Sequence, residues 1–126
     1  MSLPASAIAC APKRCPCESL IAEAGKLIGL LLPRDAVAAR FGGDEFVAAL
    51  PRSDVDATEA IGARIVEGIG AQRFDKDDVP LRLGISSGWA AFRAHAMSAL
   101  TLFHRADEAM YAAKRAGKGR VAVYGR

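Results

Sequence analysis

The sequence predicts an α+β fold, in which helices cover a sheet built around an antiparallel hairpin. Apolar residues recur at three- and four-residue steps in residues 18–32, 53–70 and 98–115, which is the spacing of one-sided helices. Short apolar runs at residues 36–41 and 46–50 flank two adjacent glycines, a pattern typical of a hairpin. Because strands and helices intermingle along the chain, we expect the helices to pack on the sheet.

Length and composition limit the classes of protein to which the chain can belong. Its 126 residues, 52% of them hydrophobic and 25% charged, suit one small domain with its own core. The net charge of +3 is too small to indicate nucleic acid or a membrane surface as the partner, although it is compatible with an anionic small molecule. No apolar run is long enough to span a bilayer. We therefore expect a cytoplasmic protein.

Three cysteines lie close together near the N-terminus, at Cys10, Cys15 and Cys17. Their odd number argues against a disulfide framework and favours a reducing compartment. A cysteine-based metal-binding protein remains an alternative that a metal analysis would decide. Neither His95 nor His104 stands at a characteristic zinc spacing from these cysteines.

The chain divides at its first acidic residue, Glu18. Residues 1–17 contain three prolines, which disfavour a long helix or a central strand. We interpret them as an irregular or degenerate N-terminal segment, or as a strand followed by a loop, and residues 18–126 as the folded domain. The first helix is expected over residues 18–32, and Pro33 ends it.

The hairpin that follows carries two adjacent carboxylates at its tip. Gly42 and Gly43 can adopt the positive φ values of a tight two-residue turn. With that turn, alternate residues of the two strands share a face. We assign to the core the face that holds Val37, Ala39, Phe41, Phe46, Ala48 and Leu50. Arg40 and Glu45 then lie together on the opposite face, close enough to interact.

The second helix is expected to begin at a capping box formed by Ser53 and Asp56. Its buried stripe is Ile61, Ile65 and Ile69, and it ends near residues 68–70. Residues 73–78 are expected to form a charged loop. Residues 81–92, with Trp89 on their apolar face, are expected to form one strand.

The last helix is expected to run from the Ser98 cap to about Arg115, with Gly117 as its C-terminal stop. Its inward residues are predicted to be Leu102, Phe103, Ala106, Met110 and Ala113. Residues 120–124 close the chain as a short strand.

Asp44 and Glu45 suggest a site for a divalent metal ion. Two adjacent carboxylates cannot both sit beside a substrate phosphate without a cation, because like charges repel. Magnesium and manganese prefer such oxygen ligands, and glycines beside them let a nucleotide approach the backbone. The alternative is ordinary turn chemistry, with both acids solvated.

Four motifs in order resemble the GGDEF family of diguanylate cyclases. The hairpin word is Arg40-Phe41-Gly42-Gly43-Asp44-Glu45-Phe46. Residues 83–88 are similar to the family's strand of the "vSiG" type, and residues 106–114 to its "ADxAmYxAK" helix. Residues 117–121 stand where the family has "GRNRV". The resemblance covers residues 18–124, so the sequence is identified as a member of the family.

The resemblance implies a nucleotidyl-cyclase fold, related to ferredoxin-like and polymerase palm domains. It implies condensation of two GTP into cyclic di-GMP and pyrophosphate, with Mg²⁺ or Mn²⁺, by a homodimer in which each protomer holds one GTP. Asp44 and Glu45 would then be metal ligands and catalytic residues, and Gly42 and Gly43 would lie against the nucleotide.

The resemblance also assigns Lys114 and Lys118 to the GTP phosphates. Lys118 stands where arginine is usual and would act as a point charge. From the residues alone, these lysines can equally be the basic C-terminus of a helix that complements its dipole.

The family's N-terminal motifs are missing from the sequence. An Asp-x-Asp on the first strand and an Asn-Asp followed by Gly-His should fall on residues 1–14, where there is no acid. The product-inhibition motif Arg-x-x-Asp also fails, because Arg34 and Asp35 are shifted from its positions. We therefore expect a sheet incomplete at the N-terminus and a weak or inactive isolated chain. The alternative function is a degenerate GGDEF module that binds nucleotide or a partner protein without turnover.

Overall fold

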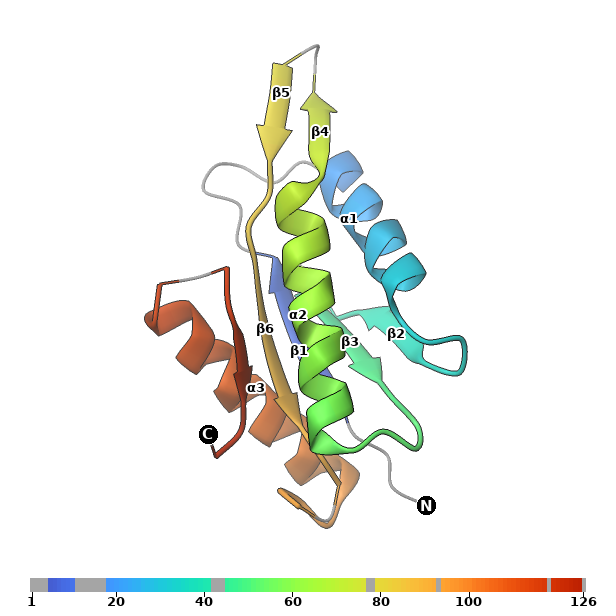
Figure 1. Ribbon diagram of the computed structural model, residues 1–126, viewed down its shortest axis with the longest axis vertical. Helices are drawn as coiled ribbons and strands as arrows, with labels where there is room; N and C mark the ends of the chain where they lie inside the picture. The colour runs from blue at the N-terminus through green and yellow to red at the C-terminus, as the bar shows by residue number, and fades with distance from the viewer. Residues whose placement is uncertain are drawn as a thin grey trace.

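The computed structural model describes residues 5–10, 18–41, 45–76, 79–92, 94–117 and 119–125. A five-stranded sheet has the strand order β2-β3-β1-β6-β7, and a separate two-stranded ribbon pairs β4 with β5 (Figure 1). In chain order the elements are β1 (Ala5–Cys10), α1 (Glu18–Leu31), β2 (Val37–Arg40), β3 (Glu45–Ala49), α2 (Val55–Ala71), β4 (Arg73–Lys76), β5 (Val79–Arg82), β6 (Ile85–Ala90), α3 (Ala99–Arg115) and β7 (Val121–Val123).

Strand β1 occupies the centre of the sheet and pairs antiparallel with both β3 and β6. The order β1-α1-β2-β3-α2-β6 is therefore the βαββαβ arrangement of ferredoxin-like folds. α3 and the parallel strand β7 extend this unit. The strand in the second interpretation of residues 1–17 is found at Ala5–Cys10, whereas residues 11–17, where the loop is expected, lie outside the described residues. The expectation of a sheet incomplete at the N-terminus is wrong, because the short uncharged run of β1 fills the central position.

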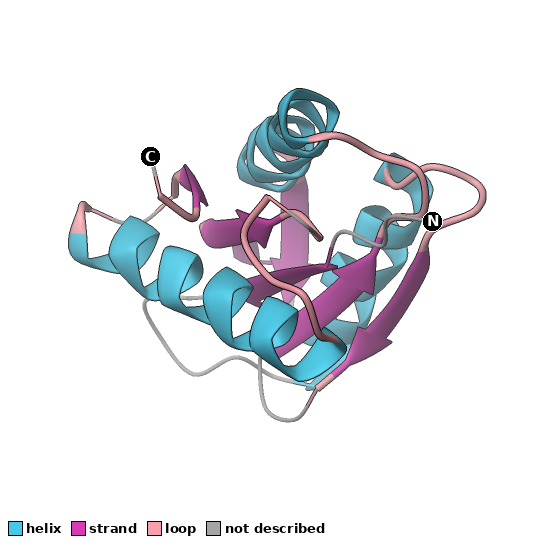
Figure 2. Cartoon of the chain, turned by 90° about the horizontal axis from the view of Figure 1, so that it is seen from below, coloured by secondary structure: helices cyan, strands magenta, loops and turns pink. Residues whose placement is uncertain are grey.

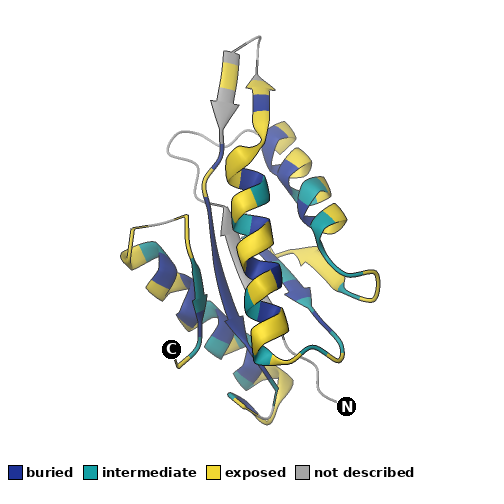
Figure 3. Cartoon of the chain, viewed as in Figure 1, coloured by how far each residue is buried: buried dark blue, intermediate teal, exposed yellow. Residues whose placement is uncertain are grey.

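The sheet separates the helices into two layers. α3 covers β6, β1 and β7 on one face, whereas α2 covers β6 and β7 on the other and packs against α1 (Figure 2). The main core lies under α1 and α2, and its largest fully buried side chains include Trp89, Ile28, Leu50, Ile65, Ile69 and Ile85 (Figure 3). Burying these apolar surfaces is the main stabilising contribution to the domain.

The helix boundaries follow the local sequence closely. α1 and α3 have the expected extents, and the Ser98 hydroxyl caps α3 by accepting a hydrogen bond from Thr101 N at 3.2 Å. The capping residue of α2 is Asp54, whose carboxylate accepts from Ala57 N at 2.8 Å, so the assignment to Ser53 is wrong. α2 also continues past Gly68 and Gly70, where the sequence predicts its end, to Ala71.

The predicted register of the β2–β3 hairpin is wrong. Phe41 N donates to Glu45 O at 2.7 Å, which leaves the three residues 42–44, not two, between the paired positions. Arg40 is consequently opposite Phe46. Side chains alternate between the two faces of a strand, so one additional residue in the loop changes which residues of β2 share a face with a given residue of β3. Phe46, Ala48 and Leu50 remain buried as expected, whereas Val37, Ala39 and Phe41 are exposed on the opposite side.

The segment after α2 also differs from the expectation. Residues 73–76 form β4 and pair with β5 in place of a charged loop, and Phe74 of β4 is buried in the core. The single strand expected at residues 81–92 is divided into β5 and β6. Both faces of β6 are buried, because helices cover it from both sides.

Candidate functional site

The structure describes two of the six predicted site residues. Glu45 is the first residue of β3, and Lys114 lies in the last turn of α3. Gly42, Gly43, Asp44 and Lys118 lie outside the described residues. The positions of Glu45 and Lys114 therefore define the candidate site.

Glu45 is held by the two strands that flank it. Its carbonyl accepts from Phe41 N, and its position in β3 is opposite Ala9 of β1. Because Phe46 packs into the core under α1, the alternating side chain of Glu45 belongs to the other face of the sheet, which is the face that α3 covers in part. The half-buried Glu45 carboxylate is thus on the same side of the sheet as the helix that carries Lys114.

Two phenylalanines connect the hairpin to this helix. The rings of Phe41 and Phe103 lie 5.1 Å apart between centroids, at an interplanar angle of 57°. The sequence predicts Phe103 in the core, but the side chain is only half-buried and contacts Phe41, which is itself exposed on the hairpin stem. Phe103 and Lys114 are about three helical turns apart and so lie on the same side of α3. Sequence reasoning missed this contact, because no local pattern indicates which distant ring a helical phenylalanine meets.

Lys114 is half-buried and its ammonium lies 5.6 Å from the centroid of the Tyr111 ring. This is a cation–π contact on the helix surface. Lys114 and Arg115 are also the basic residues of the last turn, where cations complement the helix dipole. Both interpretations of Lys114, phosphate binding and helix stabilisation, are compatible with this position.

Arg40 has a different partner from the one expected. Its guanidinium donates to both carboxylate oxygens of Glu18, at 2.7 and 3.1 Å. The predicted pairing of Arg40 with Glu45 is wrong, because the observed register places the two side chains on opposite faces. The Arg40 hydrogen bonds and positive charge lower the pKa of the Glu18 carboxyl below its ordinary value of 4.5. The ion pair joins the start of α1 to the stem of the hairpin.

We expect Glu18→Gln to lower the free energy of unfolding at neutral pH, and this deficit to shrink as the pH falls below 4.5. The folded-state pKa of Glu18 is lowered, so the ion pair contributes fully above the unfolded-state pKa and is lost as the pH falls through the folded-state value. Urea denaturation at a series of pH values measures the deficit. Glu23→Gln, at an exposed position of the same helix, is the control. A deficit for Glu18→Gln that stays constant with pH would contradict the expectation.

Comparisons with known proteins identify the family of this fold. The family model described as "Diguanylate cyclase, GGDEF domain" matches residues 17–120. The chain belongs to the GGDEF family. The sequence-based assignment of the family and of the α+β cyclase fold is thereby confirmed.

Two curated relatives show how much of a longer protein the GGDEF domain represents. The chain is 34% identical over 107 residues to the probable diguanylate cyclase DgcE of Escherichia coli. The aligned region covers 85% of the chain and 10% of DgcE. It is 39% identical over 100 residues to the diguanylate cyclase DgcP of Pseudomonas aeruginosa, and this aligned region covers 79% of the chain and 15% of DgcP. The chain thus corresponds to a small part of either relative.

A solved GGDEF domain has the same fold. The GGDEF domain of DgcB from Caulobacter crescentus, in complex with c-di-GMP, matches with a TM-score of 0.88 at 22% identity. The match covers 99% of the chain and 77% of that domain. Separately, none of the helices in the described ranges is both long and apolar enough to cross a membrane.

The GGDEF family implies a requirement for a divalent metal ion, and the described residues do not complete a site for one. Within the described ranges, no group of three His, Cys, Asp or Glu residues could hold a metal ion. β1, which lies beside Glu45, has the sequence ASAIAC and contributes no carboxylate. Hard cations need several oxygen ligands, so Glu45 alone does not form a site for a divalent metal ion. Cys15 and Cys17, on which the cysteine alternative depends, lie outside the described residues.

Proposed function

We propose that this chain is a GGDEF-type diguanylate cyclase domain, which condenses two GTP into cyclic di-GMP and pyrophosphate in signalling. The observation that carries the proposal is the contact between Phe41 and Phe103, which holds the hairpin against the helix of Lys114. Glu45 and α3 therefore share one side of the sheet, where a nucleotide could meet both. Membership of the family supports the choice of substrate.

The proposed functional residues lie in the hairpin and in or just after the last helix. Asp44 and Glu45 are proposed as catalytic residues and as ligands of Mg²⁺ or Mn²⁺, and Gly42 and Gly43 as the backbone on which the nucleotide rests. Lys114 and Lys118 are proposed to bind the GTP phosphates as point charges. Activity would need a homodimer, because each protomer supplies one GTP. We propose that residues 18–126 carry the site of this domain, with β1 as the central strand of its sheet, and that the domain belongs to a cytoplasmic protein controlled by a sensor or partner protein.

We expect Glu45→Gln to lower the formation of cyclic di-GMP by about 100-fold or more, the size of effect typical for loss of a positioned acid or base. The purified chain is incubated with GTP and Mg²⁺ or Mn²⁺ at a concentration high enough for dimers, and the product is separated by chromatography. Glu67→Gln, on the exposed surface of α2, is the matched control and is expected to retain wild-type activity. Absence of product from the wild-type chain, or equal activity of Glu45→Gln, would refute the cyclase assignment.

The register of β1 favours a second candidate function. Ala9 is the residue opposite Glu45, so the neighbouring strand lacks the carboxylate that would share a metal ion. A degenerate GGDEF module would bind nucleotide or a partner protein without turnover. Calorimetry with GTP separates the two cases: heat of binding without product supports the degenerate module. No heat with or without metal leaves only a role in protein interaction.

A further inference from the structure

Strand β7 leaves one edge of the sheet unpaired. In the part of the chain that the structure describes, β7 is the last strand of the sheet and pairs only with β6 (Figure 1). Ser87 N donates to Arg120 O at 2.9 Å, and Tyr124 N donates to Trp89 O at 2.8 Å. Because alternate residues direct their backbone groups to opposite edges, the N–H and C=O groups of Val121 and Val123 point away from β6. These groups are available to another strand.

A groove runs along this edge, between β7 and the flank of α3. Its volume is about 520 Å³, within the range of ligand pockets. Small side chains leave the space open, namely Ala109 and Ala112 on α3 and Ala122 on β7. An extended peptide can lie in such a groove, with its backbone paired to the strand and alternate side chains against the helix.

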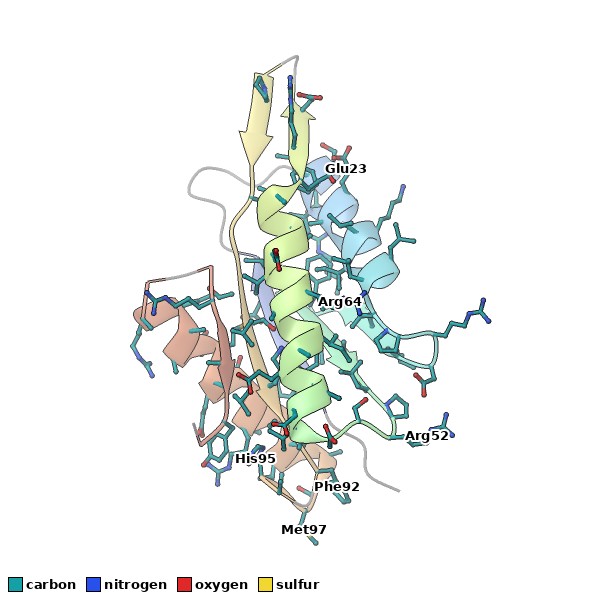
Figure 4. All side chains as sticks on the ribbon, in the orientation of Figure 1. Glu23, Arg52, Arg64, Phe92, His95 and Met97 are labelled. Atoms are coloured by element: carbon teal, nitrogen blue, oxygen red, sulfur yellow. The ribbon has the colours of Figure 1, made fainter. Side chains whose placement is uncertain are left out.

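The end of the groove near Tyr124 is held by two side chains. The guanidinium carbon of Arg105 lies 4.8 Å from the centroid of the Tyr124 ring. His95 contacts the same ring edge-on, with 5.6 Å between centroids, and Figure 4 places His95 in the connection that precedes α3. Tyr124 therefore lies near Arg105, which belongs to the first half of α3. The C-terminal end of β7 is thus close to the first half of α3, and its N-terminal end is close to the second half.

The two ends of the groove carry opposite charges. Glu108, one turn after Arg105, lines the end near Tyr124, and Arg115 lines the end near the start of β7. A guanidinium nitrogen of Arg105 lies 3.5 Å from a carboxylate oxygen of Glu108. This ion pair is exposed to solvent and therefore contributes little to stability. Arg115 makes no ion pair with any described residue. About two helical turns, or about 10 Å, separate Glu108 from Arg115, which is comparable to three residues of an extended strand.

We propose that this groove binds an extended peptide segment of another protein, which adds to β7 as an antiparallel strand. An antiparallel peptide runs from the Tyr124 end to the Val121 end. Its basic residue meets Glu108 first, and its acidic residue meets Arg115 afterwards. The middle residue between the two charges shares their face of the strand, so an apolar β-former at that position suits the alanines that line the groove.

Two peptides of identical composition test the proposal. The first is acetyl-Lys-Thr-Val-Thr-Glu-amide and the second is its reverse, acetyl-Glu-Thr-Val-Thr-Lys-amide. Each is titrated into the ¹⁵N-labelled chain, and the backbone amide signals of Val121 and Val123 are followed. We expect both amides to shift and to exchange more slowly with solvent, and the first peptide to bind about three- to tenfold more tightly, because two surface ion pairs are correctly oriented.

The charge-reversed variant Glu108→Lys/Arg115→Glu is the matched control. Both positions are exposed, so the variant should remain folded, which its circular dichroism verifies. We expect it to prefer the second peptide by a similar ratio. Unchanged Val121 and Val123 signals, or equal affinity of wild type for both peptides, overturn the proposal. Shifts of these signals that depend on protein concentration without peptide also overturn it, since a second copy of the chain would then occupy the edge.

Discussion

Gly88→Val is expected to lower the free energy of unfolding of the domain by about 3 kcal/mol or more. A side chain at Gly88 would overlap the backbone of α3, at Met110 N and Ala106 O. Backbone atoms within a helix cannot rotate away, so relief would require moving the whole of α3 off β6. Urea denaturation followed by circular dichroism measures the loss.

The matched control is the same substitution at Gly84. A Cβ atom there would have no neighbour within 4 Å, and the residue is exposed. We expect Gly84→Val to change the free energy of unfolding by no more than about 0.5 kcal/mol. If Gly88→Val is as stable as Gly84→Val, then α3 does not lie directly on β6 as described.

The second large effect is a gain of metal-dependent GTP binding in Ala9→Asp. Ala9 is directly opposite Glu45, and residues so paired have Cβ atoms about 5 Å apart. Two carboxylates at this distance can share a divalent cation. We expect GTP to bind about tenfold more tightly in the presence of Mn²⁺, measured by calorimetry. Without metal, repulsion between the two acids should lower the stability of the variant, and Mn²⁺ should restore it.

Ala7→Asp controls for the added charge. Ala7 lies on the same face of β1 two residues earlier, but it is opposite Val47, which offers no second carboxylate. We expect no metal-dependent gain from this variant. The interpretation of the β1–β3 register is contradicted if Ala7→Asp and Ala9→Asp respond alike to Mn²⁺.

Helices and family were predictable because their signals are local. The apolar spacing of α1 and the Ser98 cap of α3 depend on residues within a few turns, and the structure has both as expected. The hairpin word at residues 40–46 indicated the family that the comparison found. Family and helix positions could therefore be predicted without knowing which strands pair.

Features that depend on pairing between distant residues were predicted less well. The hairpin loop has one residue more than predicted, so the observed register differs from the predicted one. In the observed register Phe41 is exposed and Arg40 contacts Glu18. The sequence predicts a loop where β4 lies, because the strand is stabilised by pairing with β5 and by burial of Phe74, and its short charged sequence indicates neither. The roles of Asp44 and Lys118 stay predictions, since these residues lie outside the described ranges.

The sequence by itself determined the family, the α+β class and the carboxylates that a site could use. Only the tertiary structure decided what stands beside those carboxylates. It places β1 at the centre of the sheet with Ala9 opposite Glu45, and it brings Phe103 of α3 to the hairpin. The physical reason is that strand pairing and helix packing join residues far apart in the chain, whereas sequence patterns report mainly on neighbours.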